Sequence, residues 1–207
     1  MYYLDVVRDQ RVFSRHLINK IEVKKIQYTK YKMGQYYLVV ILAEKSDKEY
    51  IRTFLDPGMY NNGMKLTEHS YIGNNFMNVV ENLIGPNGMF YKSRLVWAGD
   101  YADQEPDSES NLHKLCEAKD PFVSRDSVVS YTYIVNHTKK VYVKKNSGMH
   151  LHPLSLLTAE GNGRGGGDYH GPNIDMVGTW ARDVISMENA APVVAAGPDY
   201  TLIECEF

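Results

Sequence analysis

The segment Gly161–Gly171 (GNGRGGGDYHG) is the most distinctive in the sequence, because six of its eleven residues are glycine. Glycine loses more conformational freedom on folding than any other residue. Order in such a segment is therefore expected only where a positive φ, a ligand or another chain requires it. Its N–H groups, together with the Arg164 guanidinium, could form a nest for an anion. The segment lacks the Lys-Ser/Thr pair of a P-loop and the strand–turn–helix setting of a dinucleotide site.

Three interpretations of this segment remain open: a flexible surface loop, a loop that contacts a ligand or partner, and tightly packed structure. The contact interpretation includes the neighbouring segment His150–Pro153. Its candidate contact residues are Asn162, Gly163, Arg164, Gly165, Gly166, Gly167, Asp168 and Tyr169.

Histidines and aspartates offer a second kind of chemistry. His150 and His152 are two residues apart, a spacing that on a strand places both imidazoles on one face, as in some metal sites. Asp100, Asp103 and His137 are further candidate ligands. These five residues form the alternative prediction, a divalent-metal site, beside the interpretation that the histidines are exposed or hydrogen-bonded.

The order of three short motifs resembles that of the calcineurin-like metallophosphoesterases. The motifs are Gly99-Asp100-Tyr101-Ala102-Asp103, Asn136-His137 and His150-x-His152. The resemblance implies two metal ions that activate water against a phosphoester. The sequence departs from the family in lacking an Asp-x-His motif upstream of Gly99, and in having Thr138 where an acid follows Asn-His. A metal-dependent phosphoesterase or nuclease is thus the alternative function.

The elements that must position these residues are mostly strands. Alternating apolar residues predict a hairpin of 128–135 and 140–145 with His137 at its tip. A second hairpin is expected from Lys20–Tyr28 and Tyr36–Glu44, with Glu49–Leu55 as a third strand. Asn74–Ile84 has helical spacing, an asparagine cap and a Gly-Pro stop. Further expected elements are strands at Ser93–Ala98 and Thr201–Phe207 and helices at Asn111–Ala118 and Met176–Met187.

This order lacks a regular β-α-β rhythm, so the predicted class is α+β: a mostly antiparallel sheet with two or three short helices. The 207 residues fit a single domain, 1–207, with a loop-rich C-terminal subdomain from about residue 146 as a variant. The two cysteines, Cys116 and Cys205, have no CxxC spacing, which favours a reducing compartment and a cytoplasmic location. No apolar run approaches the ~18 residues of a membrane span.

The formal net charge is −2, with basic residues in excess over 1–50 and acidic residues in excess over 150–207. The basic stretch Lys20–Lys32 is the candidate for nucleic acid, which the overall acidity and the absence of a known motif disfavour. The predicted function is a non-enzymatic cytosolic binding protein. Its partner would be another protein or a small anionic ligand, and a divalent metal is expected only in the alternative function. The Lys, Asn, Tyr and Ile content is compatible with an AT-rich bacterium or its phage.

Overall fold

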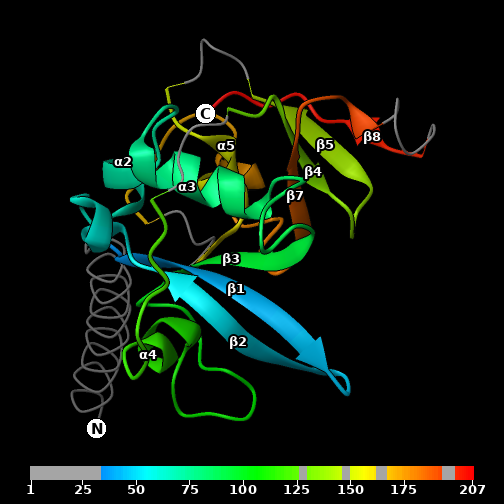
Figure 1. Cartoon of the computed structure of the whole chain (residues 1–207). Helices are drawn as coiled ribbons and strands as arrows, with labels where there is room; N and C mark the ends of the chain where they lie inside the picture. The colour runs from blue at the N-terminus through cyan, green and yellow to red at the C-terminus, as the bar shows by residue number, and fades with distance from the viewer. Residues whose placement is uncertain (1–33, 126–129, 146–149, 162–166, 193–198) are drawn as a thin grey trace, which may run out of the picture. The chain divides into compact units, whose positions relative to one another are not determined.

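The computed structural model describes residues 34–125, 130–145, 150–161, 167–192 and 199–207. Residues 34–207 form one compact unit (Figure 1). Its strands are β1 (Tyr37–Lys45), β2 (Lys48–Leu55), β3 (Ser93–Gly99), β4 (Tyr133–Asn136), β5 (Val141–Lys144), β6 (Ala159–Glu160), β7 (Val184–Glu188) and β8 (Thr201–Leu202). Its helices are α2 (Leu66–His69), α3 (Asn75–Ile84), α4 (Leu112–Cys116) and α5 (Pro153–Leu157), with 3-10 turns η1 (Pro57–Tyr60) and η2 (Ile174–Met176).

The eight strands form one sheet in the order β2-β1-β3-β7-β4-β5-β8, with β6 paired to β3 beside this path. Pairing is antiparallel except between β3 and β6 and between β5 and β8. The predicted class, α+β with a mostly antiparallel sheet, is confirmed. Among the described residues, no helix is long and apolar enough to cross a membrane.

Strand β1 is buried on both faces. Successive side chains of a strand point in opposite directions, and in β1 both sets are covered. Its odd-numbered residues from Tyr37 to Ile41 join the main core with α3, and its even-numbered residues from Leu38 to Leu42 join a smaller cluster with α4. Figure 1 shows α3 and α4 on opposite sides of the β1–β3 strands. The continuous apolar run in the sequence therefore reflects a central strand between two layers of helix.

Local signals in the sequence set the bounds of the helices. The Asn74 side chain accepts a hydrogen bond from the Phe76 N–H at 2.8 Å, and the chain leaves helical geometry at Gly85. The prediction of a helix at Asn74–Ile84 is confirmed. Helix α4 is likewise capped by Asn111, whose side chain accepts from the Lys114 N–H at 2.9 Å, but it ends two residues earlier than predicted.

The hairpin of β4 and β5 is confirmed, but β4 begins at Tyr133, later than the predicted start at residue 128, which lies outside the described residues. His137 directly follows β4. Strand β1 pairs with β2 on one edge and with β3 on the other. The hairpin partner of the Tyr36–Glu44 segment is therefore β2, and not Lys20–Tyr28, a stretch that lies outside the described residues. The predicted strand at Ser93–Ala98 is present as β3.

The helix predicted at Met176–Met187 is wrong. The chain forms η2, then a series of turns with positive φ at Gly178 (74°) and Arg182 (65°), and then strand β7. Positive φ interrupts a right-handed helix, and the pairing of β7 with β3 and β4 fixes the extended conformation instead. The helical spacing of apolar residues arises because Trp180 and Met187 are buried from a turn and a strand.

The C-terminal strand is shorter than predicted, since β8 covers only Thr201–Leu202. Beyond it the chain still alternates, and Cys205 and Phe207 are buried in the main core. The alternation at Ile203, Cys205 and Phe207 thus reflects packing of every second side chain against the core, without continued strand pairing.

Candidate functional site

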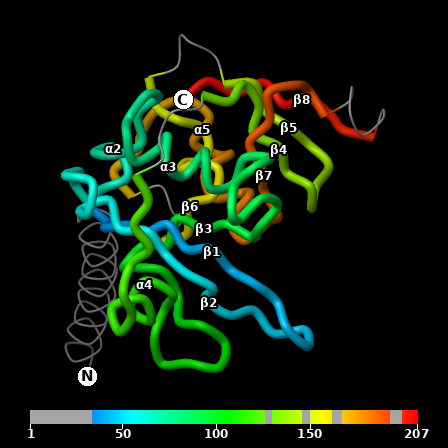
Figure 2. Tube along the Cα trace, in the orientation of Figure 1, coloured from blue at the N-terminus to red at the C-terminus, as the bar shows by residue number. Residues whose placement is uncertain are grey.

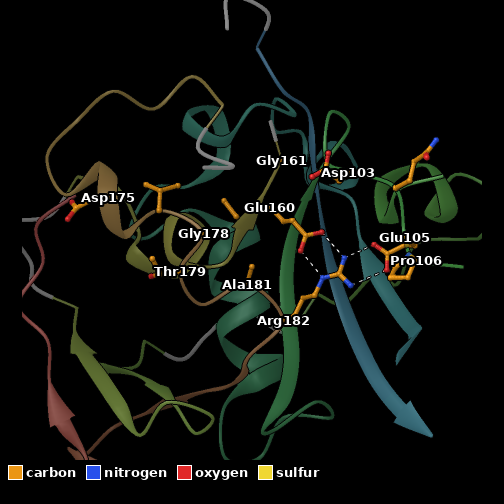
Figure 3. Close-up of a pocket in the computed structure, with 13 residues that line it drawn as sticks. Asp103, Glu105, Pro106, Glu160, Gly161, Asp175, Gly178, Thr179, Ala181 and Arg182 are labelled. Atoms are coloured by element: carbon orange, nitrogen blue, oxygen red, sulfur yellow. Dashed lines mark hydrogen bonds and ion pairs between the residues drawn. The ribbon is translucent and has the colours of Figure 1, made fainter. Parts of the chain in front are cut away.

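A cleft of about 620 Å³ lies where β6 ends and the glycine-rich segment begins. We call it the Arg182 cleft. Figure 2 shows β6 beside β3, and Figure 3 shows the lining side chains. The cleft is lined by residues 103–106, 159–161, 175, 177–179, 181 and 182. Its volume falls in the range of ligand-binding pockets, roughly 300–1,000 Å³.

The backbone around Arg182 is held in a conformation that is unfavourable for a residue with a side chain. Its φ of 65° lies in the left-handed region. The Arg182 N–H donates to the Leu95 carbonyl at 2.9 Å, and the Arg94 guanidinium donates to the Arg182 carbonyl at 3.1 Å. These bonds to β3 aim the Arg182 side chain at the cleft. Backbone strain that the surroundings enforce is concentrated at functional sites in proteins.

The Arg182 guanidinium is the centre of an ion-pair network (Figure 3). Its Nε and Nη2 donate to the two oxygens of Glu160, both at 2.7 Å. Its Nη1 and Nη2 donate to the two oxygens of Glu105 at 3.0 and 2.5 Å, and Nη1 also reaches Glu49 at 3.3 Å. The hydrogen bonds that it donates to Glu160, followed by those to Glu105, raise the pKa of Arg182 above its ordinary value. The guanidinium is therefore a fixed cation.

The described lining carries more negative than positive charge. Arg182 is its one cation, whereas four of its side chains are carboxylates: Asp103, Glu105, Glu160 and Asp175. Among the described residues, Asp103 and Asp175 have no ion-pair partner within 4 Å. Asp175 lies across the cleft from the Arg182 network (Figure 3). Acidic residues therefore belong to the lining on both sides of the cleft.

Gly161 and Gly167, two glycines of the segment, lie close to Gln35 and Tyr37 at the start of β1. A Cβ at Gly161 would overlap Gln35 Oε1, so a side chain there would require the Gln35 amide to move. Gly167 has a φ of 58°, and a Cβ at this position would lie 2.7 Å from the Tyr37 hydroxyl oxygen. The predicted contact residues Asn162, Gly163, Arg164, Gly165 and Gly166 lie outside the described residues.

The remaining predicted contact residues, Asp168 and Tyr169, are anchored. Asp168 accepts a hydrogen bond from the Thr67 hydroxyl through Oδ2, while its buried Oδ1 has no hydrogen-bond partner in the described part of the chain. The Tyr169 hydroxyl donates to the Pro172 carbonyl at 2.5 Å, and its ring packs against Phe207. The segment therefore leaves and rejoins the fold at fixed points.

The five predicted metal ligands are not gathered at one place. Within the described ranges, no group of three or more His, Cys, Asp or Glu side chains could hold a metal ion. Asp100 Oδ1 accepts from the Tyr36 N–H at 3.1 Å, and Asp103 lines the Arg182 cleft. The alternative prediction of a metal centre thus finds no ligand cluster.

The pair His150 and His152 does not share one face, contrary to the expectation for a strand. Instead of continuing a strand, His152 is the N-cap of α5, and its Nδ1 accepts from the Leu154 N–H at 3.2 Å. His152 is fully buried, whereas His150 is exposed and contacts the Tyr71 ring. The turn into the helix separates the two imidazoles.

His152 belongs to a buried network. Its Nε2–H donates to Glu81 Oε1 at 2.5 Å, and Lys145 pairs with the same oxygen. Burial lowers the pKa of His152, which keeps the ring neutral. Burial opposes ionisation of Glu81, but hydrogen bonds from His152 and Lys145 outweigh it and lower the pKa of the carboxyl. We call this group the Glu81 network.

The His137 ring lies within hydrogen-bond distance of a serine hydroxyl, the separation expected of a base and its nucleophile. Its Nε2 is 2.8 Å from Ser186 Oγ and its Nδ1 is 2.9 Å from the Tyr200 hydroxyl. The Ser186 hydroxyl donates to Glu188 at 2.7 Å and is fully buried, so it neither transfers its proton to His137 nor reaches a substrate. Burial lowers the pKa of His137.

Sequence reasoning singled out Asp103 and Gly161 of the cleft lining but missed the three residues of the ion-pair network. Glu105, Glu160 and Arg182 are far apart in the chain and belong to no motif. Two signals point in their direction: the acidic excess over 150–207, and the position of Glu160 directly before Gly161. In comparisons with protein-family models, curated proteins and solved structures, the chain matched none.

Proposed function

We propose that this chain is a binding protein that holds another protein through the Arg182 cleft and the adjoining segment Gly161–Gly171. The observation that carries the proposal is the cleft of about 620 Å³ that opens at Gly161, where the segment begins. A cytosolic location is part of the proposal. It is supported by Cys116 and Cys205, which are both free and buried thiols.

The charge of the cleft favours a basic partner over a small anion. Glu105 and Glu160 already share Arg182, and Asp103 and Asp175 add two further negative charges. Opposite unit charges at 4 Å attract by roughly 1 kcal/mol in bulk water and about 4 kcal/mol at an effective dielectric near 20. A lysine or arginine side chain of the partner gains this attraction, whereas an anion in the same place is repelled.

The proposal is tested by mapping two probes on the full chain with NMR. N-acetyl-arginine amide represents the basic side chain, and inorganic phosphate represents the small anion. We expect the arginine probe to shift backbone signals of Gly161 and 175–182, and phosphate to leave them unchanged. The double variant Asp103→Asn/Asp175→Asn should weaken the response to the arginine probe several-fold.

The control is Asp199→Asn, which removes an exposed carboxylate that pairs with Lys140 and does not line the cleft. This variant should bind the arginine probe as the wild type does. Absence of localised shifts with the arginine probe would refute the proposal. Phosphate shifts at the cleft that vanish in Arg164→Ala would instead support the small anionic ligand.

A further inference from the structure

A second hollow adjoins the Arg182 cleft. It has a volume of about 740 Å³, and we call it the Ile51 hollow. The two share Glu105, Pro106 and Arg182 in their linings. The Arg182–Glu105 ion pair therefore lies between the two cavities and forms part of the wall of each. Any ligand that fills both must pass over this ion pair.

The Ile51 hollow differs from the Arg182 cleft in being partly apolar. It is lined by Leu42 of β1, Ile51 of β2 and Leu112 of α4. Leu42 and Leu112 belong to the apolar cluster between the sheet and α4, and Ile51 packs against that cluster. Leu115 of α4 and Tyr50 of β2 extend this lining, and Tyr50 is 50% exposed. The hollow is thus a part of the sheet face that α4 leaves uncovered.

Charged side chains of both signs surround the apolar floor of the hollow. They are Asp47, Lys48, Glu49, Glu105, Asp107, Lys119 and Arg182. With four acids and three bases their charges nearly cancel, so the Ile51 hollow does not select for net charge. It offers contact to an apolar side chain, while the Arg182 cleft offers carboxylates to a cation.

We infer that one extended segment of a partner protein occupies both cavities, with a lysine or arginine side chain in the Arg182 cleft and an apolar side chain in the Ile51 hollow. The inference rests on the proposed function. A compact small molecule cannot fill two cavities on either side of an ion pair. An extended chain can, because its successive side chains project in different directions about 3.3 Å apart.

The inference identifies Arg182 as a positioning residue for this partner. Because the guanidinium binds both oxygens of Glu105 and of Glu160, it holds the two carboxylates on one wall of the cleft. The partner's cation would then contact carboxylates that are already in place. Pre-organised charges of this kind add specificity because they reject an acidic or neutral side chain.

The test selects short random peptides, displayed on phage, against the immobilised full chain. Selected peptides are then measured by fluorescence anisotropy against the wild type and its variants. We expect enrichment of peptides that carry a basic and an apolar residue a short distance apart. Replacing either residue by alanine should weaken binding about tenfold or more, the loss that follows from one buried side-chain contact.

Variants of the protein assign each half of the peptide to its cavity. Leu115→Arg and Tyr50→Ser should weaken the peptide about tenfold and leave N-acetyl-arginine amide binding unchanged. Asp103→Asn/Asp175→Asn should weaken both probes. Met89→Ser, at an exposed apolar residue outside both linings, is the matched control. Thermal unfolding verifies that each variant is folded, and Tyr50→Ser carries the test if Leu115→Arg does not fold.

Three results would overturn the inference. These are the absence of any enriched peptide, enrichment of peptides without a basic or without an apolar residue, and unchanged peptide binding in Tyr50→Ser. The proposed function fails separately: it is refuted when N-acetyl-arginine amide also produces no response at the cleft. Binding of the arginine probe without a two-part peptide would leave the function standing and remove the inference.

Discussion

The Glu81 network and the network around Arg182 use the same chemistry in opposite settings. In each, a carboxylate accepts a hydrogen bond from a cation, Lys145 in the first network and Arg182 in the second. The side chains of Glu81, His152 and Lys145 are at most 7% exposed, whereas those of Arg182, Glu105 and Glu160 are between 17% and 27% exposed. One network is sealed inside the core, and the other faces a cleft.

The difference in exposure predicts a difference in role. A buried ion group is strongly destabilised by loss of one member, because the remaining charge has no water to solvate it. A network at a cleft remains hydrated, so loss of a member costs less stability and chiefly changes what the cleft binds. We therefore assign the Glu81 network to holding α3, β5 and the start of α5 together, and the Arg182 network to the site.

The largest effect is expected from Glu81→Gln, which leaves the buried Lys145 ammonium without a negative partner. The free energy of unfolding should fall by about 3–5 kcal/mol, as measured by urea denaturation at pH 7. Asp199→Asn, which breaks an ion pair between two well-exposed side chains, should leave the midpoint nearly unchanged. A small loss in Glu81→Gln would remove the distinction between the two networks.

A second effect concerns pH and the buried His69. Its Nδ1 is 3.0 Å from the Gly63 carbonyl, and its Nε2 accepts from the Trp97 indole N–H at 2.9 Å. Burial lowers the pKa of His69 to about 4. Below pH 6.5 the unfolded chain takes up a proton that the folded chain does not. Stability should therefore decline as the pH falls from 6.5 to 4, by about 3 kcal/mol from this residue alone.

The measurement compares urea midpoints across this pH range for the wild type, His69→Gln and His170→Gln. His69→Gln should flatten the dependence, while His170→Gln, at an exposed histidine, should keep it. The lowered pKa values of His113, His137 and His152 act in the same direction and remain in both variants. An unchanged slope in His69→Gln would show that this imidazole is not held neutral by the core.

The smallest effect separates backbone strain from ion pairing at Arg182. Because its φ is 65°, glycine should be tolerated better than alanine there. Arg182→Gly should be more stable than Arg182→Ala by about 1 kcal/mol, whereas both lose the same ion pairs. Thermal unfolding of the two variants gives the comparison. Equal stability would mean that the left-handed conformation is not retained without the guanidinium.

The parts of the fold that the sequence predicted are those set by neighbouring residues. The cap of Asn74, the Gly85-Pro86 stop and the alternation in the β4–β5 hairpin act within a few residues of one another. The helix predicted at Met176–Met187 failed because a strand pairing with distant β3 overrides a local periodicity. The sequence favours Lys20–Tyr28 as a partner of the Tyr36–Glu44 segment, because it does not show which strands pair with the two edges of β1.

The site was predicted only in part. Gly161, the first residue of the glycine-rich segment, lines the Arg182 cleft, and the positive φ of Gly167 with its close approach to Tyr37 favours glycine at that position. The cleft itself depends on Arg182 meeting Glu105 and Glu160, three residues that only the folded sheet brings together. The H-x-H spacing wrongly predicted that both imidazoles share one strand face, because His152 is the N-cap of helix α5.

The position of β3 between β1 and β7 has a consequence for how the chain folds. Strand β1 pairs with β2 across a tight turn, so that hairpin can form as soon as both strands exist. The pairing of Arg94 in β3 with Val184 in β7 can form only after the chain has been synthesised as far as residue 184. At a synthesis rate of roughly 5–20 residues per second, the β3 edge stays open for several seconds. During that interval a chaperone, or a neighbouring nascent chain, could occupy the edge that β7 later closes.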